Sequence, residues 1–449
     1  MASTSLTSGP LSSHIRRIAL PMSIGFFFNT MYNVVDSFYA GKISTEALAA
    51  MALSFPVFFI IIAVSEGIAR GASALIANAV GSQDHKQEAA LSEQVYSLGF
   101  FCAIGLTLVG IFSAEPLFRI LGATGSYLDL ALAYIRPLFL GSIFFILSSM
   151  SNSILLAHGD SKTFGRVLVI GFFMNLILDP WFLYGGFGLP AMGITGISLA
   201  TILIQAIGGI YLLSVVIRRG HLPRNLVQNI RPRLRVYGEI LRQGIPTSFN
   251  MMSVALGFFV TTYYLKFYGE ATVAAFGVGT RIEQIALLPA IGIGSAVVAI
   301  VGQNNGAGKY ERVRECIQLC TRYGMILITT ASVLLYVFAT HLVTIFTDDQ
   351  EVIQLGRDYV RIVAFIQWAY VAGFIYIGCL QALKRPMYGF VEAILRKIVL
   401  PLIVFHIAVS VLEVELTGFW WSMVGINTVM AIITISYTRA TLKKLYTAS

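Results

Sequence analysis

The sequence is poor in charge. Only 12% of its 449 residues are Asp, Glu, Lys or Arg, whereas 57% are apolar. A soluble domain has about a quarter of its residues charged, so this composition indicates a polytopic membrane protein instead. Basic residues outnumber acidic ones, 31 to 22, but most of them lie in alternate loops, as orientation signals do. Nucleic acid is therefore not an expected partner.

Cysteine is also scarce, and the four that occur, Cys102, Cys316, Cys320 and Cys379, are scattered through predicted helices. Cys316 and Cys320 share a helix face, but two thiols without histidine or further cysteine make a poor metal site. We interpret all four cysteines as packing residues.

Signatures of soluble catalysts are missing from the chain. It has no phosphate-binding loop with a Walker lysine, no H-E-x-x-H and no G-x-S-x-G. We expect no enzyme, no cofactor and no pumping driven by ATP. A cleavable signal peptide is not evident either, because the first apolar segment is long and carries polar side chains.

Apolar segments long enough to cross a bilayer, which takes about 20 residues, recur along the whole chain. Twelve spans are predicted, near residues 16–40, 50–79, 92–113, 128–157, 162–184, 192–217, 241–267, 272–302, 315–340, 352–382, 386–408 and 416–439. Prolines inside them, including Pro21 and Pro137, predict kinks. With a cytoplasmic N-terminus, most lysines and arginines fall in inside segments, so both termini are predicted to be cytoplasmic.

The two halves of the sequence repeat. A single constant shift without gaps superposes Pro21 on Pro246, Gly67 on Gly292, Gly99 on Gly324 and Tyr134-Ile-Arg136 on Tyr359-Val-Arg361. The predicted fold is therefore an all-α membrane protein with two six-helix lobes, related by a pseudo-twofold axis along the membrane normal. A substrate cleft is expected between the lobes.

The predicted organisation has five parts. They are a disordered N-terminal tail (1–15), an N-lobe (16–217), a cytoplasmic basic linker (218–240), a C-lobe (241–440) and a C-terminal tail (441–449).

The first span carries a carboxylate, Asp36. On a helix, one small and polar face holds Gly25, Asn29, Asn33, Asp36 and Ala40. An ionisable side chain in hydrocarbon costs roughly 2.5–3.5 kcal/mol, so Asp36 is expected to face the bundle interior and to bind and release the coupling ion. The alternative is a structural aspartate, either hydrogen-bonded by neighbouring helices or close enough to the surface to stay wet.

A second carboxylate, Asp179, follows Asn175 by four residues in the fifth span, so both project from one face. Two carboxylates in one apolar bundle cannot both stay ionised cheaply, which allows a proton to be held there. The same oxygens, joined by Asn175 and Thr201, could instead coordinate Na⁺. The alternative for Asp179 is a capping or turn residue beside the kink at Pro180.

The repeat confines these acids to the first half, because Asp36 corresponds to Thr261 and Asp179 to Val404. Arg281 and Glu283 in the eighth span point to different faces and could line the cleft. Further candidates for substrate or network contacts are Asn33, Tyr134, Asn152 and Ser198.

Several stretches together resemble the multidrug and toxic compound extrusion family. They are Pro21 with Asp36-Ser-Phe-Tyr-Ala-Gly41, Gly67-Ile-Ala-Arg-Gly71, Asn175-Leu-Ile-Leu-Asp179-Pro180, Gly193-Ile-Thr-Gly196 through Thr201, and Val301-Gly-Gln-Asn-Asn-Gly306-Ala-Gly308. The chain is most similar to the DNA-damage-inducible branch. That resemblance implies a coupling site at Asp36, Asn175, Asp179 and Thr201, with bending of the first span at Pro21. Another branch carries acids in spans seven and ten, which have no counterpart at the corresponding depths here.

The resemblance implies a secondary antiporter that exports lipophilic or cationic drugs in exchange for protons. Two alternatives stay open: Na⁺-coupled efflux through the same residues, and a lipid-linked precursor flippase. We expect a monomer in the cytoplasmic (inner) membrane of a bacterium, with the lipid bilayer and H⁺ or Na⁺ as its other partners.

Overall fold

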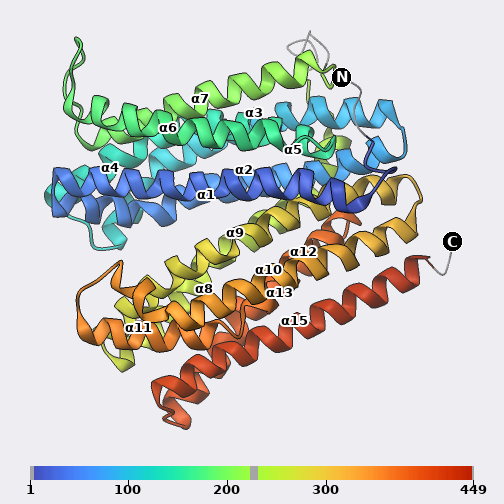
Figure 1. Cartoon of the computed structure of the whole chain (residues 1–449). Helices are drawn as coiled ribbons and strands as arrows, with labels where there is room; N and C mark the ends of the chain where they lie inside the picture. Colours follow the sequence, from blue (N-terminus) through green and yellow to red (C-terminus); the bar gives the residue numbers. More distant parts are fainter. Residues whose placement is uncertain (1–4, 223–230, 447–449) are drawn as a thin grey trace. The chain divides into compact units, whose positions relative to one another are not determined.

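The computed structural model describes residues 5–222 and 231–446, which fold into helices joined by short turns (Figure 1). The first half contains α1 (Leu11–Ile43), α2 (Thr45–Gly81), α3 (His85–Ile120), α4 (Gly125–Leu140), α5 (Ser142–Ala157), α6 (Lys162–Tyr184) and α7 (Ile194–Arg218). The second contains α8 (Leu234–Leu265), η2 (Lys266–Tyr268), α9 (Glu270–Gly306), α10 (Tyr310–Thr344), α11 (Gln350–Val363), α12 (Gln367–Ala382), α13 (Met387–Ile394), η3 (Leu395–Val399), α14 (Leu400–His406), η4 (Ile407–Val411) and α15 (Leu416–Tyr446).

These helices confirm the predicted all-α membrane architecture. Among the described residues, ten helical segments are individually long and apolar enough to cross a membrane. Two further spans are bent pairs, α4 with α5 and α11 with α12, so the number reaches the twelve predicted.

Both bent pairs break at the same place in the repeat. The α4–α5 pair bends by 47° around Gly141, and the α11–α12 pair bends by 50° around Ala364–Ile366. The sequence predicts a kink at Pro137, and the first break follows four residues later, where the Gly141 N–H donates to the Pro137 carbonyl. The second break has no proline beside it, so proline alone does not explain the bends.

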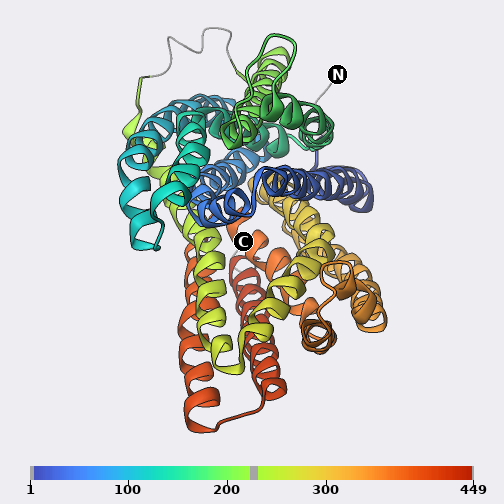
Figure 2. The ribbon, with the colours of Figure 1, turned by 90° about the vertical axis from the view of Figure 1, so that its left-hand side faces the viewer.

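The chain forms two compact units. Unit 1 contains Ile24–Ser248, and unit 2 contains Ser5–Ser23 together with the chain from Phe249 onward. Figure 2 looks nearly along several helices of unit 1 (blue to green), which gather into one bundle. The lobe boundary predicted at residues 217–241 thus differs from the observed one, because the first helix of each repeat begins in one unit and continues in the other.

Glycines at corresponding positions of the repeat permit two close helix crossings. A Cβ on Gly67 would lie 2.5 Å from the backbone of Ser248 in unit 1, and a Cβ on Gly292 would lie 2.6 Å from the Ala19 carbonyl in unit 2. Only glycine allows such close helix packing. Pro21 and Pro246 each stand two residues before the point where the helix passes from one unit to the other.

The predicted N-terminal tail needs a correction for residues 5–15. Leu6 is fully buried, its N–H donates to Gln303 Oε1 at 3.0 Å and its carbonyl accepts from Asn304 Nδ2 at 3.1 Å. The helix α1 already begins at Leu11. Composition suggested disorder, but the segment satisfies its backbone polar groups on α9. Residues 1–4 lie outside the described residues.

Two other predicted boundaries also shift. The basic linker predicted at 218–240 is shorter, because α7 runs to Arg218 and α8 begins at Leu234, while 223–230 lie outside the described residues. The predicted C-terminal tail is helical as far as Tyr446, and 447–449 are likewise outside the described part.

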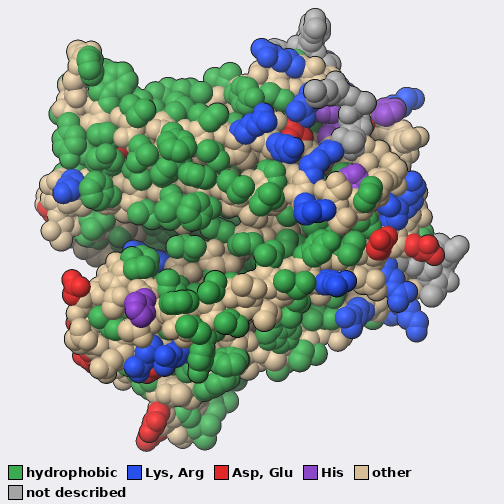
Figure 3. All heavy atoms as spheres, viewed as in Figure 1, with side chains coloured by type: hydrophobic (Ala, Val, Ile, Leu, Met, Phe, Trp, Pro, Cys, Tyr) green, Lys and Arg blue, Asp and Glu red, His purple; other side chains and the backbone are tan. Residues whose placement is uncertain are grey.

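The outer surface is apolar along the helices. On the face shown in Figure 3, hydrophobic side chains cover much of the helix length, and Lys and Arg gather near helix ends. Exposed Phe100, Phe112 and Ile177 are examples in unit 1. Such a surface suits hydrocarbon, where backbone polar groups must be satisfied within helices.

Candidate functional site

Three helices of unit 1 bring the predicted coupling residues together. Asp36 comes from α1, Asn175 and Asp179 from successive turns of α6, and Thr201 from α7. Asn175 Nδ2 donates to Asp36 Oδ1 at 2.8 Å, and the two carboxyl groups lie within hydrogen-bonding reach of each other. Their exposed fractions are only 3% for Asp36 and 0% for Asp179. Asp179 lies inside α6, so it is neither an N-cap nor a turn residue.

The carboxyl pair has fewer donors than acceptors. Within the described residues, neither oxygen of Asp179 accepts a hydrogen bond from a donor, and Asn175 Oδ1 is unpartnered as well. Two adjacent buried carboxylates repel each other and have lost their water. A proton shared by the pair, or a cation among these oxygens, would satisfy the arrangement chemically.

Tyr32 is a member of this cluster that the sequence analysis did not single out. It lies one turn before Asp36 on α1, is buried, and donates from its hydroxyl to Thr201 Oγ1 at 3.0 Å. The spacing of four residues was the available signal. Tyr134, a predicted network contact, is buried on α4 and lies close enough to interact electrostatically with both carboxyl groups.

The other predicted contacts are not drawn into the cluster. Asn33 is exposed and donates to the Asn29 carbonyl on its own helix, so it lies outside the buried cluster, and a contact with substrate stays a prediction. Tyr32, rather than Asn33, lies on the buried side with Asp36. Ser198 is buried but donates to the Thr195 carbonyl on α7. Asn152 is buried on α5, and its Oδ1 has no partner among the described residues.

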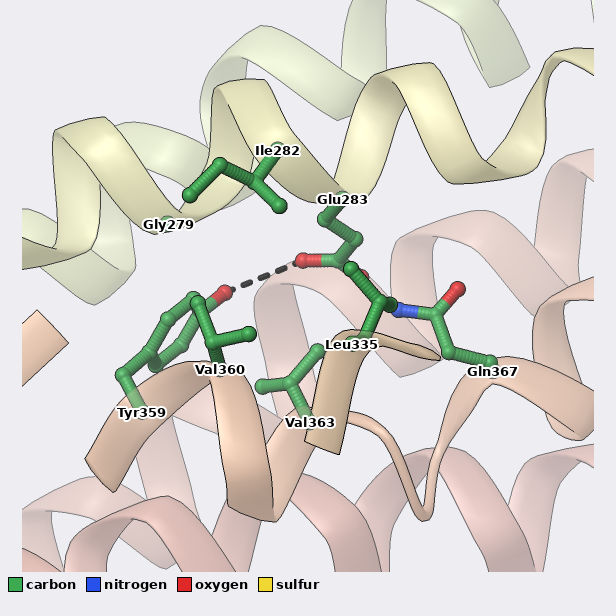
Figure 4. A pocket seen from close by; sticks show the side chains of 8 residues that line it. All are labelled: Gly279, Ile282, Glu283, Leu335, Tyr359, Val360, Val363 and Gln367. Atoms are coloured by element: carbon green, nitrogen blue, oxygen red, sulfur yellow. Dashed lines mark hydrogen bonds between the residues drawn. The ribbon is translucent and has the colours of Figure 1, made fainter. Parts of the chain in front are cut away.

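Glu283 of α9 lines a pocket in unit 2 (Figure 4). The Tyr359 hydroxyl on α11 donates to Glu283 Oε2 at 3.0 Å. Gln367, at the start of α12, directs its amide nitrogen toward the same carboxyl group. Apolar side chains, including Leu335 and Val363, complete the lining. The sequence indicated that Glu283 lies in a span and needs a partner. It did not indicate that Tyr359 is that partner.

Comparisons with known proteins agree with the repeat. A family model described as MatE matches residues 21–181 and, separately, residues 246–412. The two matches begin at Pro21 and Pro246, which are the same two prolines that the internal repeat superposes.

Curated relatives cover nearly the whole chain. A "FAD transporter" of Shewanella oneidensis is 27% identical over 88% of this chain and 88% of its own length. A "Probable multidrug resistance protein NorM" of Thermotoga maritima is 26% identical over 91% of this chain and 88% of its own. Among solved structures, an outward-facing multidrug resistance MATE family transporter superposes with a TM-score of 0.92 at 24% identity, over 98% of both chains.

Proposed function

Because the chain belongs to the MatE family of membrane transporters, we propose that it exports lipophilic or cationic compounds in exchange for protons, carried by Asp36 and Asp179. It is a transporter and not an enzyme. Relatives named as multidrug resistance and multidrug export proteins support drug efflux. The coupling role is an inference from the geometry of unit 1.

The main support for this proposal is that Asp179 lacks hydrogen-bond donors among the described residues. One amide, Asn175 Nδ2, serves the pair through Asp36 Oδ1, and the Tyr32 hydroxyl is used by Thr201. In the described part of the chain neither Asp179 oxygen accepts a hydrogen bond of normal geometry. A proton bound here removes one negative charge and supplies the missing donor in one step. Its release restores the repulsion, so the protonated and deprotonated states favour different local packing.

Sodium remains the alternative coupling ion. It would bind to oxygen ligands, and the cluster offers Asp36, Asp179, Asn175 Oδ1 and Thr201 Oγ1. Because both ions would use the same oxygen atoms, the transport experiment has to distinguish H⁺ from Na⁺.

Pro21 gives α1 a bending point. A proline inside a helix removes one backbone hydrogen bond and clashes with the preceding turn. Pro21 stands where α1 passes from unit 2 into unit 1, ahead of the segment that carries Tyr32 and Asp36. We therefore include bending at Pro21 in the transport cycle.

The decisive experiment is ethidium transport by the purified full chain in liposomes, with a proton gradient or a sodium gradient imposed separately. We expect the proton gradient to drive transport, and Asp36→Asn and Asp179→Asn to reduce it to the level of empty liposomes. Asp129→Asn, which alters an exposed aspartate of the same unit, is the matched control and should transport normally.

Full activity of Asp36→Asn would refute the coupling role, and transport driven by sodium alone would replace the proton with Na⁺. The relative named as a FAD transporter motivates one further arm, in which FAD replaces ethidium. Transport of FAD or of a lipid-linked headgroup, without any ethidium transport, would overturn the proposed substrate class.

A further inference from the structure

A cluster of two histidines and a glutamate lies in unit 1, away from the carboxyl pair. Glu88 stands in the first turn of α3, His158 directly follows α5, and His221 follows α7. Glu88 Oε1 and His158 Nε2 are 2.8 Å apart, and the rings of His158 and His221 stack with their centroids 3.6 Å apart. One ligand atom from each of the three residues lies within 4.8 Å of the others.

Local structure explains why the three side chains meet. The helices α5 and α7 both end with a glycine at positive φ, Gly159 at 78° and Gly220 at 77°. In each turn a later N–H reaches back to the helix, from Asp160 to the Leu155 carbonyl and from His221 to the Val216 carbonyl. This glycine-terminated turn folds the chain back over the last helical turn. The two turns bring His158 and His221 together beside Glu88. The space among these three side chains is called the gap below.

The hydrogen bonds of His158 leave a position for a proton or a metal ion between His158 and Glu88. His158 Nδ1 lies 2.8 Å from the Ile154 carbonyl, which can only accept, so this nitrogen carries a proton. In a neutral ring Nε2 then has a lone pair, and that lone pair faces a carboxylate oxygen of Glu88. Two acceptors at 2.8 Å need a proton or a metal ion between them.

His221 provides the second imidazole. The ring of His221 is half-buried and stacks on that of His158. Its ring nitrogens make no hydrogen bond to any residue that the structure describes. Neutral imidazole and carboxylate are ligands that suit Zn²⁺.

We propose that Glu88, His158 and His221 form a binding site for a divalent transition-metal ion, with Zn²⁺ as the preferred occupant. The ion joins the start of α3 to the ends of α5 and α7. The bond from His158 Nδ1 to a backbone carbonyl is the outer contact that orients metal-binding histidines in other proteins. Water or His85, whose Nδ1 lies 3.2 Å from Glu88 Oε2, completes a tetrahedral set.

Binding requires only small movements. Tetrahedral Zn²⁺ holds its nitrogen and oxygen ligands about 3.3 Å apart, so the contact between Glu88 and His158 opens by about half an ångström. The two rings are inclined by 30°, and the half-buried His221 ring has to turn so that one nitrogen points into the gap. Arg219, the nearby guanidinium, is already paired with Asp160 at 2.6 Å.

The test is direct titration of the metal-free full chain in detergent with Zn²⁺, followed by calorimetry and by the melting temperature. We expect one Zn²⁺ per chain and a higher melting temperature with bound metal, because a ligand that binds only the folded state stabilises it. Glu88→Gln, His158→Gln and His221→Gln should each weaken binding by about tenfold or more. His341→Gln, an exposed histidine of unit 2, should bind as the wild type does.

Co²⁺ gives a second readout that does not depend on the tolerance of the buried His158 to substitution. The wild type should show the intense visible absorption of tetrahedral Co²⁺, and His221→Cys should keep binding and add a thiolate charge-transfer band. Equal Zn²⁺ affinity in His221→Gln and wild type would overturn the proposal. So would a Co²⁺ spectrum that does not change in His221→Cys.

Discussion

Tyr134 in unit 1 and Tyr359 in unit 2 occupy the same position of the repeat, and each stands beside a carboxyl group. The carboxyl groups themselves come from different positions. Unit 1 uses Asp36 on α1 and Asp179 on α6, whereas unit 2 uses Glu283 on α9. A shared tyrosine thus serves two different polar sites.

At the other positions of the repeat, neither unit has the polar residues that form the site of the other unit. Where unit 1 has Asp36, Asn175, Asp179 and Thr201, unit 2 has Thr261, Leu400, Val404 and Ile426. Thr261 is buried and donates to the Gly257 carbonyl on its own helix. Conversely, the counterpart of Glu283 is Phe58, which packs against Phe145 with the ring centroids 5.4 Å apart.

The two units share their scaffold although their chemistry differs. The helices α2 and α9 begin at corresponding positions, Thr45 and Glu270, and are both 37 residues long. A Cβ on Gly99 would lie 2.8 Å from Ile146, and a Cβ on Gly324 would lie 2.7 Å from Val371, which is the repeat counterpart of Ile146. The repeat therefore keeps helix packing, while the polar residues differ between its copies.

The largest expected effect separates the two carboxylate sites. Asp36→Asn should abolish proton-driven ethidium transport, while Glu283→Gln should retain most of it, because the described lining of the Glu283 pocket contains no second carboxyl group to share a proton. The measurement is initial transport rate in liposomes at equal amounts of protein. A complete loss of transport in Glu283→Gln would show that carboxyl groups in both units couple transport to protons. The proposed difference between the two units would then be wrong.

Because Gly99 and Gly324 pack in the same way, substitutions at the two positions should lower stability by similar amounts. Gly99→Ala and Gly324→Ala each force a methyl group against a packed side chain, with an expected cost of about 1–3 kcal/mol. The apparent melting temperatures of the two variants should fall by similar amounts. Gly105→Ala is the control, since a Cβ placed there has no atom within 4 Å apart from the adjacent backbone of its own helix.

The donor to Asp36 should matter more than an average hydrogen bond. Asn175→Leu keeps the approximate volume but leaves a buried carboxylate oxygen without its donor, which costs about 1–3 kcal/mol. We expect a lower melting temperature at high pH, and a smaller loss at low pH where a proton can take over the role of the amide. An equal loss at both pH values would argue against a protonatable pair.

Tyr359→Phe should have the smallest effect. Glu283 is half-buried and has Gln367 beside it, so the lost hydrogen bond should cost only about 0.5–1.5 kcal/mol. Melting temperature is again the measurement, with the transport rate as the control. A loss as large as that of Asn175→Leu would show that unit 2 depends on its polar site as much as unit 1 does.

Local sequence patterns predicted much of the architecture of this protein. Apolar segments of bilayer length predicted the twelve spans, and the single constant offset between the halves predicted the duplication that the two family matches repeat. The spacing of four residues between Asn175 and Asp179 placed both on one face of α6, since helix geometry relates residues at that distance whatever surrounds them.

Other features depended on contacts between segments far apart in the sequence. Which side of α1 is buried decided that Tyr32, rather than Asn33, accompanies Asp36. Packing against α9 ordered the start of the chain, and Tyr359 gave Glu283 a partner 76 residues away. Helix periodicity determines which residues share a face, but only the neighbouring helices determine which face loses its water.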